Sequence, residues 1–128
     1  MKFNSTWWTL EAPPTWDVSE DDSCVTLACN KESALQISAA RKNSGNVTDA
    51  DIKEFVGDHP EGRRLARFAT PYFEGYRADY TKRGRHWKEW WLRSQDLLVY
   101  VTYNVKSPLD LPQEQQVEAI VHSIKRRF

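Results

Sequence analysis

The sequence predicts an α+β fold in which helices flank an antiparallel sheet of about six strands, in the order βββ-α-βββ-α. Several segments alternate apolar and polar side chains with the period of two that strands have. Two other segments repeat apolar residues at i, i+3 and i+4, as helices do. Short connections between the strands favour antiparallel pairing, with the helices on the sheet. The 128 residues suit a single domain, residues 1–128, with one core.

The first three expected strands lie in the N-terminal third of the chain. Residues 7–12 (WWTLEA) alternate briefly and stop at Pro13, because proline cannot donate to a strand ladder. Residues 24–30 (CVTLACN) and 33–42 (SALQISAARK) alternate clearly, and turn-forming residues lie between them. These two segments are therefore expected to form a hairpin.

A short helix is expected next. Thr48 is placed to cap its N-terminus, and acidic residues in the first turn suit the positive end of the helix dipole. Gly57 and then Pro60 are expected to end it. The apolar stripe of this helix consists of Ile52, Phe55 and Val56.

The expected second group of strands is a three-stranded meander over residues 64–105. Residues 64–81 are expected to form one long or broken strand, in which Pro71 and Gly75 mark an edge position or a bulge. Residues 86–94 and 97–105 are expected to form a hairpin with a tight turn.

The clearest helix is expected at the C-terminal end. Pro112 suits its first turn, and the basic residues 125–127 suit the negative end of its dipole. Its apolar residues recur at i, i+3, i+4, i+7 and i+11, and they are Val117, Ile120, Val121, Ile124 and Phe128. This stripe predicts a helix that continues to Phe128.

The segment RGRHWKEWWLRSQDLLVYVTY, residues 83–103, places three tryptophans within five residues. In a strand, Trp90 and Leu92 share one face, which is expected to form the core beneath both helices. Trp87 and Trp91 share the opposite face with charged residues. The candidate binding residues of that second face are Trp87, Trp91, Arg93, Tyr100 and Tyr76.

Two interpretations of this aromatic and polar face compete. Tryptophan, tyrosine and arginine among polar residues are typical of an interaction surface, and Trp91→Asp would then leave the fold intact. The alternative is packing, because aromatic cross-strand pairs stabilise sheets by about 0.2–1 kcal/mol each. In that case the N-terminal segment, with its own tryptophans, is a candidate to cover the face.

Charge and motifs exclude several classes of protein. Eighteen basic residues balance eighteen acidic ones, which argues against function by bulk attraction to nucleic acid or anionic lipid. Residues 1–30 nevertheless hold one basic and five acidic residues, whereas residues 77–93 hold six basic and two acidic ones. The sequence has no phosphate-cradling glycine loop, no Gly-x-Ser-x-Gly motif and no Cys-x-x-Cys pair. Histidine spacing predicts no metal site, and we expect no enzyme and no cofactor.

The cysteines and the hydropathy pattern bear on the location of the protein. Cys24 and Cys29 are an odd number of residues apart on an expected strand, so they face opposite sides and are expected to stay unbridged. No apolar stretch is long enough to span a bilayer, and residues 1–14 lack the apolar region of a signal peptide. A cytoplasmic protein without a membrane segment is therefore expected.

The order of elements and three short motifs resemble the PsbP-like and Mog-type Ran-binding fold. The motifs are an early WxLxxPxxW (Trp8, Leu10, Pro13 and Trp16), LQIS at residues 35–38, and VTY at residues 101–103 before the amphipathic C-terminal helix. This resemblance implies a non-enzymatic sandwich that binds other proteins. Relatives of that fold include a small-GTPase binder, photosystem accessory proteins and bacterial effector chaperones. No functional residue carries over from the resemblance.

The leading hypothesis is a cytoplasmic protein–protein interaction module of the adaptor, effector-chaperone or immunity kind. Its partner is another protein or a second copy of the chain, bound through the aromatic sheet face. One alternative is single-stranded nucleic-acid binding by the basic, aromatic hairpin at residues 77–93, although the zero net charge argues against it. The other is a small-ligand carrier with a pocket between the sheet and the N-terminal tryptophans.

Overall fold

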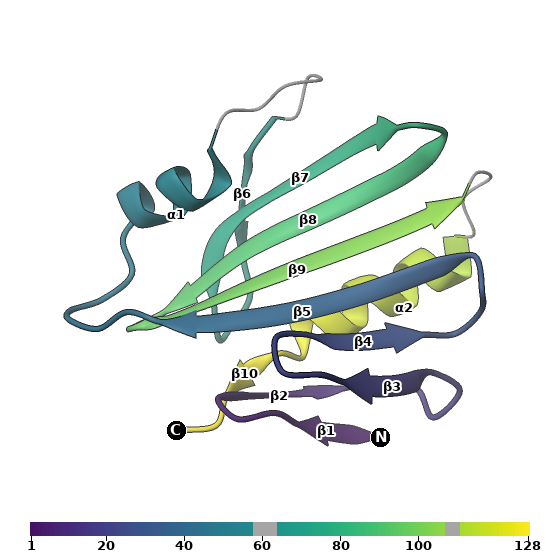
Figure 1. The fold of residues 1–128 in the computed structure, drawn as a ribbon, viewed down its shortest axis with the longest axis horizontal. Coiled ribbons are helices and arrows are strands. Elements are labelled where there is room, and N and C mark those ends of the chain that lie inside the picture. The colour runs from purple at the N-terminus through teal and green to yellow at the C-terminus, as the bar shows by residue number, and fades with distance from the viewer. Residues whose placement is uncertain (58–63, 107–110) are drawn as a thin grey trace.

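The computed structural model describes residues 1–57, 64–106 and 111–128 (Figure 1). Its elements are β1 (Lys2–Asn4), β2 (Trp8–Glu11), β3 (Asp17–Glu20), β4 (Val25–Ala28), β5 (Ser33–Arg41), α1 (Asp49–Val56), β6 (Ala66–Ala69), β7 (Glu74–Lys82), β8 (Arg85–Ser94), β9 (Leu97–Lys106), α2 (Leu111–His122) and β10 (Lys125–Arg126). One antiparallel sheet has the order β3-β4-β5-β9-β8-β7-β6, and a smaller one has the order β1-β2-β10.

The α+β class and the antiparallel pairing are confirmed, but the expected strand number and order are wrong. Within the described residues, five strands precede α1, four lie between the helices and one follows α2. The strands that the sequence pattern missed are short: β1 and β3 have three and four residues and β10 has two. Segments this short show too little alternation to be distinguished from loops.

Of the two alternatives expected for residues 64–81, a long strand or a broken one, the structure has the broken one, β6 and β7. A turn separates β6 from β7, closed by a 2.8 Å hydrogen bond from the Thr70 N–H to the Phe73 carbonyl. The Thr70 hydroxyl also accepts the amide of Phe73 at 3.1 Å, so Pro71 lies in a turn and not at a strand edge. Gly75 lies within the β7–β8 pairing, where a Cβ atom would stand 1.8 Å from the Trp91 carbonyl oxygen. Only glycine allows the two strands to approach this closely.

Both expected hairpins are present, and so is the expected meander pairing of the second hairpin with the preceding strand. β4 pairs with β5, β7 with β8 and β8 with β9, all antiparallel. Arg83 and Gly84 have positive φ values of 53° and 75° in the β7–β8 turn, as a tight hairpin turn requires. Cys24 and Cys29 are not joined by a disulfide, as expected.

Helix α1 begins as the sequence predicts. The Thr48 hydroxyl accepts the Asp51 amide at 3.1 Å, and the Asp51 carboxylate accepts the Thr48 amide at 2.9 Å, which completes a capping box. Gly57 ends the helix, with φ at 70°. Pro60, the second expected stop signal, lies outside the described residues.

Helix α2 ends earlier than the apolar stripe predicts. The helix stops at His122, and residues 125–126 pair with β2 as strand β10. The backbone groups of β10 therefore find their hydrogen bonds in a sheet instead of a helix. Ile124 still enters the core, but Phe128 is 81% exposed, so the expected helical stripe is wrong at that position.

The large sheet has two differently covered faces, which we name by their helices. The α2 face carries Trp90, Leu92, Val99 and Val101, and it packs against α2 and the three-stranded sheet in the main core. The α1 face carries Trp91 and Tyr76, and it packs against Ile52 of α1 in a second cluster. The expectation that both helices cover one face is therefore wrong, because α1 lies on the other side of the sheet (Figure 1).

Two N-terminal tryptophans, Trp8 and Trp16, pack against the α2 face and not against the α1 face. Trp8 and Trp16 are each 2% exposed and belong to the main core. The Trp16 indole N–H donates to Gln116 of α2 at 2.9 Å. Ion pairs complete the attachment of α2, including Arg77 to Glu118 at 2.6 Å. Covering of the α1 face by the N-terminal segment is therefore wrong for these two tryptophans.

Candidate functional site

Strand β8 places its three tryptophans in three environments. Trp90 is fully buried in the main core, with the Arg77 guanidinium 5.3 Å from its ring centroid. Trp91 is 1% exposed and lies in the second cluster. Trp87 is half-buried. Strand periodicity assigned these residues to the correct faces but did not reveal how each face is covered.

Trp91 and Tyr76 are packing residues of the second cluster. They pair directly across β8 and β7, and Tyr76 is 7% exposed. Ile52 and Val47 bury them from the side of α1. The expectation that Trp91→Asp leaves the fold intact is therefore in conflict with the burial of this indole, since an unpaired carboxylate there would lose its hydration.

Tyr100 links the buried and accessible parts of the α1 face. Its ring stacks on Trp91 at 5.7 Å between centroids, and the Phe55 ring meets it edge-on at 5.4 Å. Its hydroxyl donates a hydrogen bond to the Glu89 carboxylate, and Glu89 is 3% exposed. Tyr100 is half-buried, so only part of its ring remains accessible.

Arg93 fastens the start of α1 to the sheet. Its guanidinium lies 3.1 Å from Asp49 of α1 and 3.0 Å from Glu74 of β7, and it donates to the Val47 carbonyl at 3.0 Å. These contacts use the head of the side chain within the fold. The structure therefore gives Arg93 a positioning role for α1.

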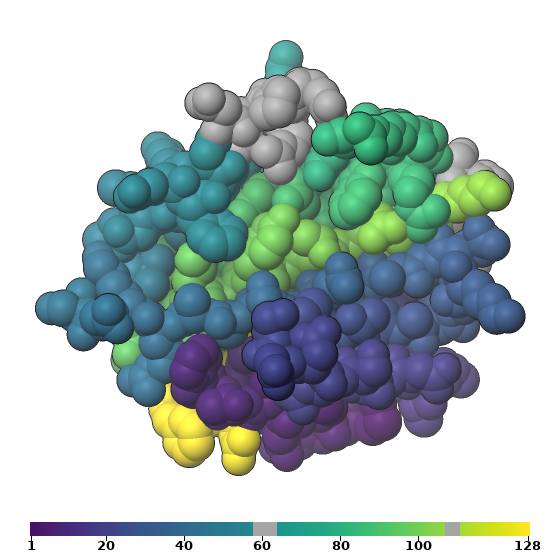
Figure 2. Space-filling view, in the orientation of Figure 1, coloured from purple at the N-terminus to yellow at the C-terminus, as the bar shows by residue number. Residues whose placement is uncertain are grey.

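Trp87 lies at the end of the α1 face that α1 does not reach. Its indole stacks on Tyr80 with a centroid separation of 6.3 Å and an interplanar angle of 5°. We call this region the open end, and it consists of Tyr80, Trp87, Thr102, Asn104, Gln36 and Thr26. Figure 2 shows α1 over one part of this side of the molecule and the surfaces of β9 and β5 beside it.

The open end is polar apart from its two aromatic rings. The Gln36 amide donates to the Thr26 hydroxyl at 3.3 Å, and the Arg85 guanidinium donates to the Asn104 side chain at 2.9 Å. All its members are half-buried or exposed. Of the five candidate residues, the structure therefore leaves Trp87 as the accessible aromatic side chain of this end.

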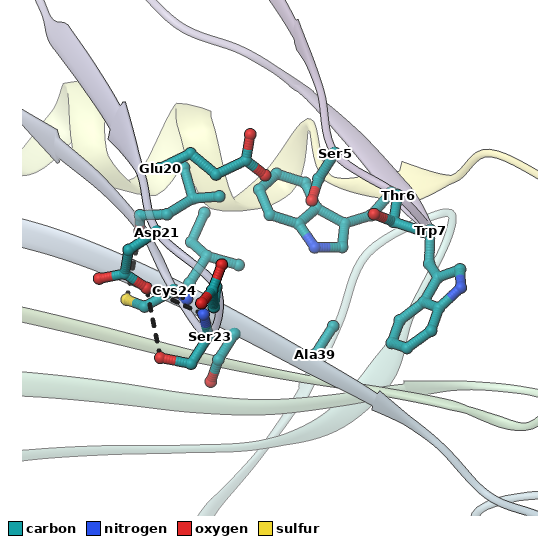
Figure 3. A pocket seen from close by; sticks show the side chains of 13 residues that line it. Ser5, Thr6, Trp7, Glu20, Asp21, Ser23, Cys24 and Ala39 are labelled. Atoms are coloured by element: carbon teal, nitrogen blue, oxygen red, sulfur yellow. Dashed lines mark hydrogen bonds between the residues drawn. The ribbon is translucent and has the colours of Figure 1, made fainter.

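A cavity of about 300 Å³ lies between the large sheet and the N-terminal tryptophans (Figure 3). The half-buried Trp7 indole stands on one side, and Glu20 at the end of β3 and Asp21 of the β3–β4 turn stand on the other. Asp22 also lines the cavity. The Ser23 and Cys24 amides donate to Asp21, and these hydrogen bonds lower the pKa of its carboxyl group. A pocket in this place is what the carrier hypothesis expects.

The remaining ionisable residues show no arrangement for metal binding. Among residues 1–57, 64–106 and 111–128, no group of three His, Cys, Asp or Glu side chains could hold a metal ion. His86 Nδ1 lies 3.3 Å from the Thr81 hydroxyl, and His122 Nδ1 lies 2.7 Å from the Glu118 carbonyl. Within the same part of the chain, no helix is long and apolar enough to cross a membrane.

The basic hairpin of residues 77–93 is partly neutralised within the fold. Arg77 pairs with Glu118, Lys88 lies 3.5 Å from Glu114, and Arg93 has the two carboxylates described above. A phosphate backbone would compete with these carboxylates for the same cations. This geometry weighs against the nucleic-acid alternative.

No family model and no curated protein matches this chain. Among solved structures, it is similar to a protein from Bacteroides thetaiotaomicron VPI-5482, with a TM-score of 0.73 and 14% identity over 99% of this chain. The chain spans 48% of the length of that protein. It is also similar to LpqN of Mycobacterium tuberculosis, with a TM-score of 0.57, 12% identity, and 93% and 82% of the two chains covered. At these identities the similarity extends to the fold alone.

Proposed function

We propose that this protein is a non-enzymatic protein-binding module whose partner docks on the open end of the α1 face. The observation that carries the proposal is the stacked pair of Trp87 and Tyr80. It presents a large, half-buried aromatic surface beside a polar stretch of sheet. An accessible tryptophan among hydrogen-bonding groups is typical of a binding hot spot.

The side chains of the open end suit one kind of partner. Trp87 offers an apolar contact, while Thr102, Asn104 and Gln36 offer hydroxyl and amide groups in neighbouring positions on β9 and β5. A partner segment with one apolar side chain and flanking polar groups would satisfy both. The same surface on a second copy of the chain is a self-complementary alternative of the same kind.

The resemblance to PsbP-like and Mog-type proteins supports a binding role, because it implies a fold that works without catalysis. A cytoplasmic location is part of this proposal. LpqN is described as involved in cell envelope biogenesis, so the cell envelope is the competing location. The adaptor, effector-chaperone and immunity roles remain alternatives within the same proposal.

The decisive experiment is a pull-down from lysate of the native host with three baits: the wild type, Trp87→Ala and Trp7→Ala. Trp7 is the matched control, because it is also half-buried but lies at the cavity of Figure 3. We expect a partner that the wild type and Trp7→Ala recover equally and that Trp87→Ala recovers at least tenfold less. Sedimentation velocity of the same variants tests self-association. Equal recovery by all three baits would exclude the open end.

The cavity beside Trp7 favours a second candidate, a small-ligand carrier. Its lining residues include three carboxylates and no lysine or arginine, so an organic cation is the ligand class that fits. Titration with a panel of amines and quaternary ammonium compounds should change tryptophan fluorescence in the wild type but not in Trp7→Phe. The absence of any saturable change would remove this candidate.

A further inference from the structure

The outer surface of the three-stranded sheet holds a cavity that the proposed function does not use. Asn4 of β1 pairs with Thr9 of β2, and Thr9 pairs with Lys125 of β10, so the three residues form one row across the sheet. The cavity has a volume of about 270 Å³. Its lining residues are Lys2, Asn4, Thr9, Lys125, Arg126 and Arg127.

Thr9 places a hydroxyl group in the middle of this row. The residue is 7% exposed, but its hydroxyl is not one of the buried side-chain atoms that lack a hydrogen-bond partner, which among the described residues are Trp90 Nε1 and Arg93 Nε. A hydroxyl group can both donate and accept a hydrogen bond. Because Thr9 lines the cavity, its hydroxyl is placed to bond to a group bound there.

Among the described residues, three of the four cations at this cavity, Lys2, Lys125 and Arg127, form no ion pair with a side-chain carboxylate, whereas the Arg126 guanidinium lies 3.0 Å from Asp96. Glu11 lies opposite Lys2 in the β1–β2 pairing, and its carboxylate is 3.8 Å from the Met1 ammonium. The Lys125 ammonium instead lies 5.4 Å from the Tyr72 ring centroid. Three cations therefore gather at one cavity in a chain whose formal net charge is zero.

We propose that this cavity binds a phosphate group, carried by a small phosphorylated molecule or by a phospholipid headgroup. A phosphate offers several acceptor oxygens and up to two negative charges, which matches the donors of Lys2, Lys125 and Arg127 together with the Asn4 amide and the Thr9 hydroxyl. A carboxylate has fewer acceptor positions and a single charge. The proposal is independent of the open end, because the two sites share no residue.

The first test is a titration of the amide NMR spectrum with inorganic pyrophosphate, at constant ionic strength, against sodium sulfate and sodium chloride. We expect saturable shifts at residues of the row, and an affinity at least fivefold lower in Lys125→Ala and at least twofold lower in Thr9→Val. Lys53→Ala is the matched control, since it removes one exposed positive charge on α1 and should not change the affinity. Circular dichroism verifies that each variant is folded.

Three outcomes would overturn the proposal: no saturable shift, an equal response to chloride, or an equal loss in Lys53→Ala and Lys125→Ala, which would indicate bulk electrostatics. A second arm distinguishes the two sources of the phosphate. Co-sedimentation with vesicles of phosphatidic acid and phosphatidylcholine, but not with phosphatidylcholine alone, would assign a headgroup if Lys125→Ala abolishes it. Pyrophosphate binding without vesicle binding would assign a small soluble ligand. Neither result depends on a protein partner at the open end.

Discussion

Trp91 and Trp87 lie on the same strand and the same face of the sheet, yet their environments are opposite. Trp91 is 1% exposed beneath α1, with the Tyr100 ring stacked on it. Trp87 is half-buried, and its stacking partner Tyr80 belongs to the sheet itself. The difference comes from α1, which is eight residues long and covers one end of a sheet whose central strands have nine or ten residues. A short helix thus divides one face into a second core and an accessible surface.

The largest expected effect follows directly from this division. Trp91→Ala should lower the free energy of unfolding by about 3–5 kcal/mol, because it leaves a cavity in a closed cluster. Trp87→Ala should lower it by about 1 kcal/mol or less, since the indole is only partly removed from water. Urea denaturation followed by circular dichroism measures both values. Equal losses would show that the open end is as closely packed as the covered end.

The second prediction compares the loss of stability when Gly75, next to Trp91 in the β7–β8 pairing, or Gly84, in the β7–β8 turn, is replaced by alanine. Gly75→Ala should destabilise the protein by about 3 kcal/mol, because the new Cβ would stand 1.8 Å from the Trp91 carbonyl oxygen and a backbone atom cannot move aside easily. Gly84→Ala, in the hairpin turn, should cost about 1 kcal/mol, because its Cβ meets no atom within 4 Å and only its positive φ of 75° is strained. The same urea experiment ranks the two. A smaller loss in Gly75→Ala would contradict the close approach of β7 and β8.

The fold was predictable from sequence where elements are long and regular. The alternation of residues 33–42 and 97–105 identified β5 and β9 together with the orientation of their side chains. Thr48 identified the start of α1 because capping is local chemistry. The pairing of β10 with β2 could not be predicted in this way. A strand of two residues is too short to show alternation, and its partner β2 lies more than 100 positions away in the sequence.

The candidate site was predictable only in part, for a related reason. Periodicity assigns Trp87 and Trp91 to one face, but it carries no information on which tertiary element covers that face. The cation cavity was missed because the residues 125–127 were assigned to a helix end, where basic side chains serve the dipole. Once these residues form a strand and its continuation beside β2, they lie next to Lys2 and Thr9. Such proximity is a property of the fold and not of any local pattern.

A smaller loss of stability is expected when the N-cap of α1, the helix over one end of the α1 face, is removed. Thr48→Ala removes the hydroxyl that accepts the Asp51 amide in the capping box and should lower the free energy of unfolding by about 1 kcal/mol. Hydrogen exchange should increase in α1 and leave β8 near Trp87 unchanged, because the cap affects only the covered end. Thr6→Ala, an exposed threonine outside α1, is the control and should have no effect on α1. Uniform acceleration across the sheet would mean that α1 does not open separately.

The smallest expected effect is a dependence of the stability of α1 on pH. Hydrogen bonds from the Lys42 ammonium at 2.6 Å and from the Thr48 amide lower the pKa of Asp51 from 3.8 to about 2. Because the folded-state pKa is depressed, the stabilisation by Asp51 is complete above pH 3.8 and is lost as the pH falls towards 2. The carboxyl carbon resonance of Asp51 should therefore titrate near pH 2, and Lys42→Ala should raise that midpoint.

The indole resonances extend this test to the two ends of the face. Between pH 4 and pH 2, loss of the Asp51 contacts should loosen α1 and broaden the Trp91 indole signal before that of Trp87. Trp87 stacks on Tyr80 and is not a member of the cluster that contains Ile52 of α1, so its signal should change only with global unfolding. Asp51→Asn, which cannot titrate, should remove the early change at Trp91. Simultaneous broadening of both indole signals in the wild type would show that the two ends of the α1 face open as one unit. The two ends would then differ in the solvent exposure of their tryptophans but not in their local stability.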